Sequence, residues 1–170
     1  RGLAIRWVNH GGGCSLHVPG QLAAYPIWPF QPGQLDLADY MGRLEHCLLE
    51  TLRQFDVHGT ARPDHSGVWT PAGQVASIGV SISRWVTYHG MTINVSGTKD
   101  RFRILHPEGN GALRATTMEA ERQRPAPMAK VRECLISKFV ESFQPARCNL
   151  YTQHPMLTTP GRPRVYARSS

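Results

Sequence analysis

The residues best suited to chemistry lie in a glycine-rich loop and in a short histidine–glutamate pair. The loop reads HGGGCSLH from His10 to His17. Glycines allow a backbone to approach a ligand closely and to point N–H groups at a carbonyl oxygen, although a glycine run can also be only a tight turn. His106 lies two residues before Glu108, so in an extended segment both side chains face the same way. With eight histidines in the chain, such a pair also arises by coincidence.

Hydrophobic spacing predicts the elements that must hold these residues in place. Apolar residues at three- and four-residue steps predict a helix over residues 37–55, with Asp36 as its N-cap, and a second helix over residues 128–143. β-Branched and aromatic residues predict strands at residues 3–8, 23–27, 75–82, 85–95 and 102–105, and residues 62–67 are rich in turn formers. The sequence therefore predicts an α/β (α+β) domain with a predominantly antiparallel or mixed sheet.

Composition limits the classes of function. The chain has 170 residues, of which 19 are basic and 12 acidic, and its formal charge of +7 favours an acidic partner or simply solubility. The basic residues are scattered without a nucleic-acid-binding motif, so a nucleic-acid function would rest on charge alone. Four cysteines without CxxC spacing predict neither a metal site nor a disulfide framework, and no apolar run is long enough for a membrane span. We expect a cytoplasmic protein.

Three segments, each without internal gaps, together resemble the octanoyltransferase (lipoyl(octanoyl)transferase, lipoate-protein ligase B) family. Residues 10–27, HGGGCSLHVPGQLAAYPI, resemble the family's RGGxxTxHxPGQLxxYPI. Residues 67–95, GVWTPAGQVASIGVSISRWVTYHGMTINV, resemble GVW…KIAAIGVRxSRWVTxHGxALNV. Residues 102–118, FRILHPEGNGALRATTM, resemble FxxIxPCGIxGxxVTSL. The segments occur in the family's order.

The resemblance implies a biotin/lipoate ligase-like mixed sheet flanked by helices, and an acyl transfer that needs no cofactor. In the family a cysteine takes octanoyl from acyl carrier protein as a thioester, and a lysine of the enzyme stabilises its thiolate. The acceptor is a lysine on a lipoyl domain of a 2-oxoacid dehydrogenase or glycine cleavage protein. The implied partners are therefore octanoyl-acyl carrier protein and lipoyl domains, without a metal or a membrane.

Both catalytic positions differ from the family. Glu108 stands where the family has the cysteine, and Gln74 stands where it has the lysine. The changes are chemically coupled, because a cation has nothing to activate once the thiolate is gone. Glu108 could still act as a general base toward an incoming amine, but a hydrogen-bonded carboxylate in a lapsed site is the simpler interpretation. Cys14, inside the glycine-rich loop, is either a relocated nucleophile or a small buried hydrophobe.

The resemblance also implies a set of substrate-binding residues. His10 replaces a family arginine, while His17 and His89 match family histidines at the site, where each either contacts substrate or holds a loop by hydrogen bonds. Two strand segments flank the acyl chain in the family, and their Ile78 and Met91 either line that chain or belong to the core. The full predicted set is His10, Gly11, Gly12, Gly13, Cys14, Ser15, Leu16, His17, Ser77, Ile78, Gly79, His89, Gly90, Met91 and Thr92.

The resemblance covers residues 1–143 and starts part-way through the family's domain, so we expect the family's N-terminal strand–helix portion to be missing. Residues 144–170 are expected to form an extended or disordered tail. The predicted function is an octanoyltransferase-like protein of lipoate biosynthesis whose transfer is impaired or absent, a pseudoenzyme candidate. The alternative is a non-catalytic module that binds a lipoyl domain, acyl carrier protein or an acyl ligand.

Overall fold

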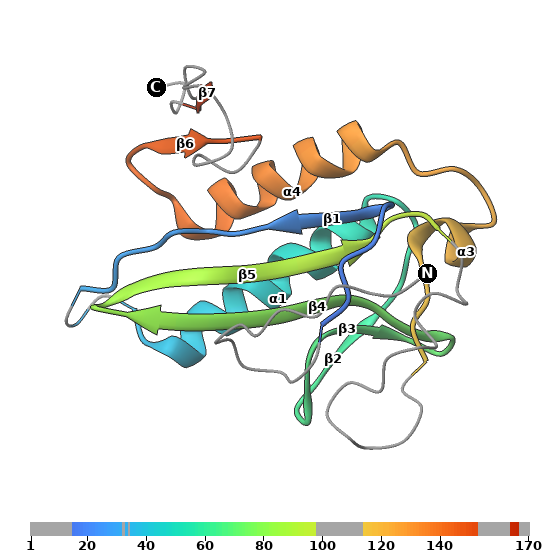
Figure 1. The fold of residues 1–170 in the computed structure, drawn as a ribbon, viewed down its shortest axis with the longest axis horizontal. Helices are drawn as coiled ribbons and strands as arrows, with labels where there is room; N and C mark the ends of the chain where they lie inside the picture. The colour runs from blue at the N-terminus through green and yellow to red at the C-terminus, as the bar shows by residue number, and fades with distance from the viewer. Residues whose placement is uncertain (1–14, 32, 34, 98–113, 153–163, 167–170) are drawn as a thin grey trace.

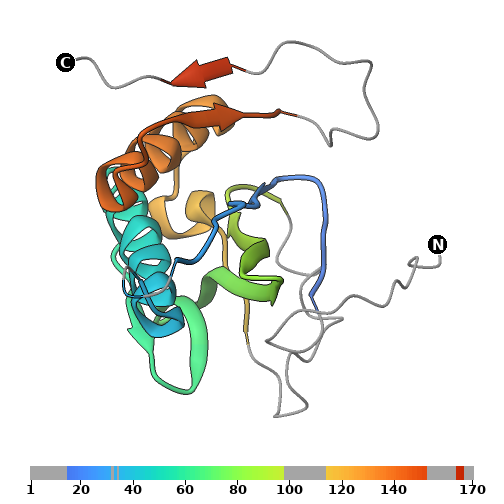
Figure 2. The same cartoon turned by 90° about the vertical axis from the view of Figure 1, so that its left-hand side faces the viewer.

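A five-stranded antiparallel sheet organises the part of the chain that the computed structural model describes, which is residues 15–31, 33, 35–97, 114–152 and 164–166. The strand order is β1–β5–β4–β3–β2 (Figure 1). The strands are β1 (Gln21–Ala24), β2 (Thr60–Arg62), β3 (His65–Thr70), β4 (Gly73–Ser83) and β5 (Val86–Asn94). Helices α1 (Leu37–Arg53) and α4 (Met128–Phe143) lie on the same side of this sheet (Figure 2). The predicted α+β sheet flanked by helices is confirmed.

The long hairpin of β4 and β5 is the centre of the sheet. Its register runs from Ser83 opposite Val86 to Ala76 opposite Ile93. Strand β4 has Val and Ile, and β5 has Val, Ile and Thr, residues that suit a pleated and half-buried surface. The two strands predicted at residues 75–82 and 85–95 match these elements to within two residues. The hairpin therefore follows from local sequence.

Helix α1 begins at Leu37 because Asp36 caps it. The Asp36 side chain accepts a hydrogen bond from the Asp39 backbone N–H at 2.8 Å, which satisfies one of the free donors of the first turn. Its apolar residues recur on one face and are completely buried: Tyr40, Leu44, Cys47, Leu48 and Leu52. The helix predicted from residue 37 onward is thus confirmed, and it ends at Arg53, two residues before the predicted end.

The core lies between the helices and the facing side of the sheet. From α4 it takes Val131, Leu135 and Phe143, and from the sheet it takes mainly Val68, Val75, Ala76, Ile78, Met91 and Ile93. Trp28 and Phe143 are in ring contact, with centroids 5.1 Å apart. The helices and the core thus cover one side of the sheet, and the residues on its other side do not belong to this core.

Several elements differ from the sequence-based expectation. Strand β1 ends at Ala24 rather than Ile27, since Pro26 cannot donate to a ladder. Residues expected to be a turn belong to the β2–β3 hairpin, and α3 (Met118–Arg122) has no counterpart among the predicted elements. The expected tail contains β6 (Cys148–Leu150) and β7 (Arg164–Tyr166), which pair antiparallel. The strands predicted at residues 3–8 and 102–105 lie outside the described residues. No described helix is both long and apolar enough to cross a membrane.

We expect Leu48→Ala to lower the free energy of unfolding by about 2–5 kcal/mol, because it leaves a cavity at a fully buried position of α1. Urea unfolding followed by circular dichroism measures this. Leu37→Ala in the same helix is the matched control, since Leu37 is exposed, and should change stability by about 0.5 kcal/mol or less. Equal losses in the two variants would contradict the core described above.

Candidate functional site

The side of the sheet that faces away from α1 and α4 carries small and polar residues. Side chains along a strand alternate between the two sides of the sheet. Ala76 and Ile78 of β4 face the core, so Ser77 and Gly79 face the other side. Their partners across the ladder are Thr92 and Gly90. We call this surface the polar sheet face: Gln21, Ala23, Gln74, Ser77, Gly79, Gly90, Thr92 and Asn94. All of its sequence-predicted members come from the two segments that flank the acyl chain in the resemblance, apart from Gln74.

Ser77 and Thr92 form the middle of the polar sheet face. Their hydroxyl oxygens are 2.7 Å apart and share a hydrogen bond, and both side chains are half-buried. Thr92 lies opposite Ala23, whose small side chain is exposed. Only glycine fits at position 90, because a Cβ there would lie 2.3 Å from the Ala24 carbonyl oxygen. The chain after β1 therefore passes tightly over one end of this face.

The carboxamide of Asn94 connects three distant segments on this face. Its Oδ1 accepts a hydrogen bond from Gln21 Nε2 at 2.8 Å. Its Nδ2 donates to the carbonyl oxygens of Gln74 at 3.3 Å and Thr116 at 3.1 Å. The side chain is only 7% exposed, and its bond to Thr116 is buried, while its bonds to Gln21 and Gln74 are partly buried. These segments are the three that resemble the octanoyltransferase motifs, and Asn94 therefore holds them together.

Gln21 fixes the end of the loop that contains the predicted glycine run. Its Oε1 accepts the Val18 backbone N–H at 2.9 Å while its Nε2 reaches Asn94. Gly20, with a φ of 97°, brings its carbonyl oxygen to the N–H groups of Val95 and Ser96, each at 3.0 Å. A Cβ on Gly20 would lie 2.4 Å from the Ser96 carbonyl oxygen, so only glycine fits.

Gln74, which the motif resemblance predicts at the family's lysine position, lies at the rim of the polar sheet face. Its side-chain Nε2 donates to the Ser66 carbonyl oxygen at 3.3 Å. Its backbone N–H donates to the Arg114 carbonyl oxygen at 2.8 Å, and its own carbonyl accepts the Thr116 N–H at 2.9 Å. The preceding Gly73 has a φ of 145°, and a Cβ there would lie 2.2 Å from the Arg114 oxygen. Residues 114–116 therefore run beside Gln74, six residues after Glu108 in the chain.

Gln74 has a buried tryptophan as its neighbour on the adjacent strand. Trp69 of β3 lies directly opposite Gln74 in the ladder. Its indole N–H donates to the His65 carbonyl oxygen at 3.3 Å, and the Arg62 guanidinium lies 4.8 Å from the ring centre. Because Trp69 is outside the main core, its burial comes from the residues at this end of the sheet. Gln74 thus has a buried aromatic residue as its ladder partner, while its own side chain is half-buried.

The remaining predicted residues are placed as follows. Glu108 and the loop residues His10, Gly11, Gly12, Gly13 and Cys14 lie outside the described residues. Ser15 and His17 are exposed and Leu16 is half-buried, just ahead of β1. His89 adopts a left-handed φ of 61° in β5, and its ring lies 4.9 Å from that of Tyr88. A left-handed histidine within a strand costs backbone energy, which the neighbouring structure must offset.

Ile78 and Met91 face the helices rather than the polar sheet face. They lie opposite each other in the ladder and are almost completely buried in the core. Their side chains pack with the residues of α1, so any contact that they make with a ligand stays a prediction. By contrast, Ser77, Gly79 and Thr92 are half-exposed on the other side.

The described cysteines have the properties of structural thiols. Burial raises the pKa of Cys47 to about 11, and burial also raises the pKa values of Cys134 and Cys148. A raised pKa reduces the thiolate fraction at neutral pH, and the thiolate is the reactive form. None of these three cysteines is therefore an activated nucleophile. Among the described residues, no group of three or more His, Cys, Asp or Glu side chains could hold a metal ion.

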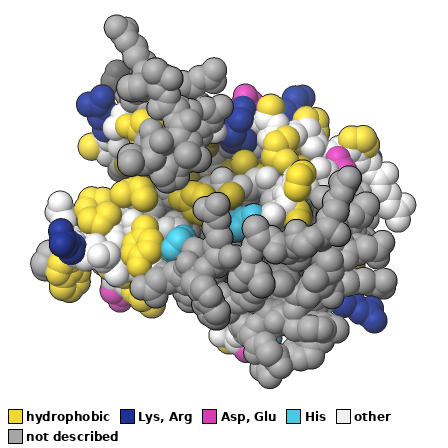
Figure 3. All heavy atoms as spheres, viewed as in Figure 1, with side chains coloured by type: hydrophobic (Ala, Val, Ile, Leu, Met, Phe, Trp, Pro, Cys, Tyr) yellow, Lys and Arg dark blue, Asp and Glu magenta, His cyan; other side chains and the backbone are white. Residues whose placement is uncertain are grey.

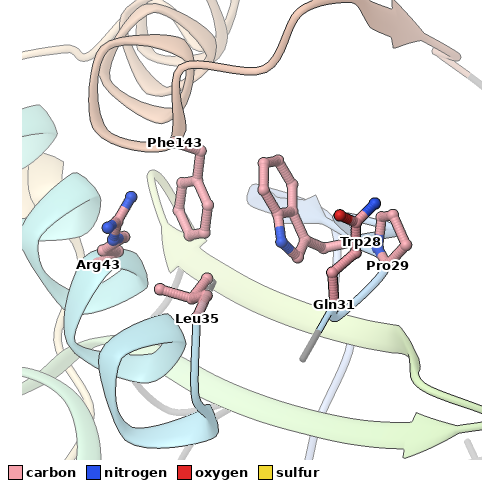
Figure 4. Close-up of a pocket in the computed structure, with 6 residues that line it drawn as sticks. All are labelled: Trp28, Pro29, Gln31, Leu35, Arg43 and Phe143. Atoms are coloured by element: carbon pink, nitrogen blue, oxygen red, sulfur yellow. The ribbon is translucent and has the colours of Figure 1, made fainter. Parts of the chain in front are cut away.

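A cavity of about 150 Å³ lies on the helix side of the sheet, away from the predicted site (Figure 4). Its walls are Trp28, Pro29, Gln31, Leu35, Arg43 and Phe143. Arg43 is already engaged, since it donates to the Ser142 carbonyl oxygen at 3.0 Å and lies 5.8 Å from the Phe143 ring centre. The cavity contains none of the sequence-predicted residues and offers no nucleophile or free acid–base group among its walls.

Comparison with known proteins agrees with the motifs on the polar sheet face. Residues 1–140 match the family model of the lipoyl protein ligase A/B catalytic domain. An octanoyltransferase of Geobacter metallireducens is 36% identical over 138 residues, and one of Geotalea uraniireducens is 34% identical over 148 residues. This chain belongs to the octanoyltransferase family. The alignments cover 81% and 85% of the chain, and 65% and 69% of the two relatives. The chain thus spans about two thirds of their length, and 59% of a Desulfovibrio desulfuricans relative.

Solved structures confirm the fold of this family member. A lipoate-protein ligase A bound with ATP aligns with a TM-score of 0.66 at 12% identity, covering 80% of this chain and 57% of that one. A biotin protein ligase from Aquifex aeolicus aligns with a TM-score of 0.58 at 17% identity, covering 74% and 53%. At these identities the likeness concerns the fold alone, and it confirms the predicted biotin/lipoate ligase-like architecture.

Sequence reasoning missed the residues that assemble the site. Gln21 and Asn94 both occur at matched positions of the quoted motifs, in PGQL and INV, yet amides carry no obvious chemistry that would single them out. Their importance lies in a hydrogen bond between residues 73 positions apart. Polar residues inside otherwise apolar strand segments were the available signal, since buried amides need partners.

We expect Asn94→Ala to lower the free energy of unfolding by about 1–3 kcal/mol, because it leaves the Gln21 amide and two carbonyl groups without their partner. Amide exchange at Thr116 should accelerate more than exchange in α1, since the lost bonds anchor residues 114–116. Asn149→Ala, at an exposed position of β6, is the matched control and should have little effect. Unchanged exchange at Thr116 would contradict the connecting role of Asn94.

Proposed function

We propose that this chain is an octanoyltransferase-like protein of lipoate biosynthesis in which cysteine-dependent octanoyl transfer is impaired or absent. The observation that carries the proposal is the environment of Gln74. A neutral amide, donating to the Ser66 carbonyl oxygen, occupies the position where the family has a lysine. An amide cannot stabilise a neighbouring thiolate as an ammonium group does. The family's cysteine position is likewise occupied by Glu108.

The polar sheet face supports retained acyl binding. Ser77, Gly79 and Thr92 have small side chains there, and Asn94 holds the flanking segments in fixed positions. Gly79 is not one of the described glycines with a positive φ, so backbone conformation does not require a glycine there. A glycine there adds no side chain to this side of the strand. We propose that an octanoyl group lies along this face, beside Gly79.

The proposed partners are octanoyl-acyl carrier protein and lipoyl domains of 2-oxoacid dehydrogenase or glycine cleavage proteins. Both partner classes suit a basic protein, and the chain has a formal charge of +7. We propose a cytoplasmic location, which the three unpaired described cysteines support. We also propose a domain boundary near residue 143, where α4 ends.

A second candidate function is a non-catalytic module that binds an acyl ligand or an acyl-carrying domain. The raised pKa values of the described thiols favour it, because those cysteines do not offer a replacement nucleophile. Glu108 as a general base would instead favour residual transfer without a covalent intermediate. The two functions are separated by whether the acyl group leaves this protein.

Intact-mass spectrometry tests transfer directly, after incubation of the chain with octanoyl-acyl carrier protein and an apo lipoyl domain. We expect no octanoyl mass increment on the lipoyl domain within the time in which the Geobacter metallireducens relative modifies it completely. The reason is the absence of both the thiolate and its cation. An increment on the lipoyl domain would contradict the impairment, and an increment on this chain would identify an acyl intermediate.

Restoring the dyad is the complementary experiment. We expect the Glu108→Cys/Gln74→Lys variant to transfer octanoyl at least tenfold faster than the original chain, and faster than either single variant. The reciprocal replacement in the Geobacter metallireducens relative, at its matched positions, should abolish its transfer. Should the relative keep its activity, the alignment of Glu108 and Gln74 with the dyad would be wrong.

Gly79→Val tests where the acyl group binds. Valine is favourable in a strand, and its side chain would project from the polar sheet face, where the acyl group is proposed to lie. We expect at least a tenfold loss of affinity for octanoyl-acyl carrier protein relative to the unacylated carrier, measured by isothermal titration calorimetry. Ser81→Val, two residues nearer the hairpin tip, is the control and should retain the preference. If both variants keep the preference for the octanoyl carrier over the unacylated carrier, the acyl group binds elsewhere.

A further inference from the structure

The tip of the β4–β5 hairpin has an unusual turn. Ser83 pairs with Val86, so Arg84 and Trp85 form a two-residue loop. Both have positive φ, 49° at Arg84 and 64° at Trp85. A two-residue turn with two positive φ values favours Asn-Gly strongly, because side chains with a Cβ are disfavoured there. The arginine and tryptophan therefore occupy this turn at a cost in backbone energy.

The backbone of the tip is held in place while its side chains are not used for packing. The Phe30 N–H donates to the Trp85 carbonyl oxygen at 2.8 Å, and the Thr87 N–H donates to the Trp28 carbonyl oxygen at 2.9 Å. These bonds join the turn to the chain that follows β1. The Trp85 side chain is nevertheless 72% exposed. The core therefore gives no reason for a tryptophan at this position.

Other apolar side chains are exposed around the same end of the sheet. Four of the six large hydrophobic side chains that are exposed in the described part lie on the hairpin or on the neighbouring segment after β1. They are Trp85, Ile27 (66% exposed), Tyr25 (52%) and Ile82 (40%). Figure 3 shows hydrophobic side chains gathered at this end of the molecule. An exposed apolar group of this kind often marks a protein contact.

The hairpin and the segment beside it carry no acidic residue. Neither residues 15–35 nor residues 65–99 contain an Asp or Glu, although the whole chain has 12 acidic residues. Arg84 is therefore not neutralised by a carboxylate from the hairpin or from the segment beside it. A guanidinium next to an indole suits a carboxylate-bearing protein surface, since arginine and tryptophan are enriched where interfaces gain most of their affinity.

We propose that Arg84 and Trp85 form a docking site for acyl carrier protein, with Arg84 pairing an acidic side chain of the carrier and Trp85 buried against it. This rests on the proposed function, because the carrier is the acyl donor there. The Ser77–Thr92 pair lies six residues along β4 from the turn, which is roughly 20 Å in a strand. The tip therefore contacts the body of the carrier, while the polar sheet face is left for the acyl group.

The test is the Arg84→Asn/Trp85→Gly variant of the whole chain, which installs the residues that this turn favours. The melting temperature should stay the same or rise, because the backbone strain is removed. Affinity for octanoyl-acyl carrier protein should fall at least tenfold, measured by calorimetry in low salt. Tyr151→Ala removes another exposed aromatic side chain, from the segment after α4, and should leave the affinity unchanged. Unchanged affinity in the double variant would overturn the proposal.

Two further measurements distinguish the carrier from a membrane surface as the occupant of the tip. The affinity of the original chain for the carrier should fall with added salt, because Arg84 contributes a charged contact. Binding to vesicles of anionic phospholipid that depends on the tip, without effect on the carrier, would overturn the proposal. If the chain binds octanoyl carrier with dependence on Gly79 but not on the tip, only the docking site is wrong. If it binds no carrier at all, the proposed function fails as well.

Discussion

The structure depends on the buried carboxamide of Asn94. Its three hydrogen bonds reach Gln21, Gln74 and Thr116, so one side chain connects the loop before β1, the rim of β4 and the residues that follow the segment of Glu108. The bonds join positions that are up to 73 residues apart, and they are buried or partly buried, where a hydrogen bond is stronger than at the open surface. The arrangement of the polar sheet face follows from this connection, because the core on the other side fixes only the apolar halves of the strands.

Close backbone approach is the second constraint, and it acts at the same places. Gly20 allows its carbonyl to meet the end of β5, and Gly73 allows residues 114–116 to pass beside β4. In both cases a Cβ would come within 2.4 Å of a carbonyl oxygen, which no small adjustment relieves. Because these glycines flank Gln21 and Gln74, they place the amides that Asn94 joins. Hydrogen bonds and close backbone approach therefore act together to bring the three motif segments to the same end of strands β1, β5 and β4.

The sequence predicts the individual helices and strands better than the hydrogen bonds that join distant segments. Helices α1 and α4 and the β4–β5 hairpin follow from apolar spacing, because each depends on residues close together in the chain. The β2–β3 hairpin was missed although Pro63 and Asp64 are typical turn residues, since residues 62–67 were interpreted as loop only. Gln21 and Asn94 escape a sequence-based search because their partners are distant, and the positive φ values of Arg84 and Trp85 contradict ordinary turn preferences. The motif resemblance located the strands of the site, but not the amide that assembles them.

The way Gln74 is bound explains how the chemistry can change without the fold. Asn94 and Thr116 use the backbone carbonyl of Gln74, and Arg114 uses its N–H, so the connections to these three residues do not involve the side chain, which donates to the Ser66 carbonyl oxygen instead. These backbone bonds do not depend on whether the side chain is a lysine or a glutamine, whereas the nearby charge does. Replacing the cation removes a means of stabilising a thiolate while leaving Gly73, Asn94 and residues 114–116 in register. On the proposed assignment of Gln74 and Glu108 to the dyad positions, the chain in this way keeps the surface on which the acyl group is proposed to lie.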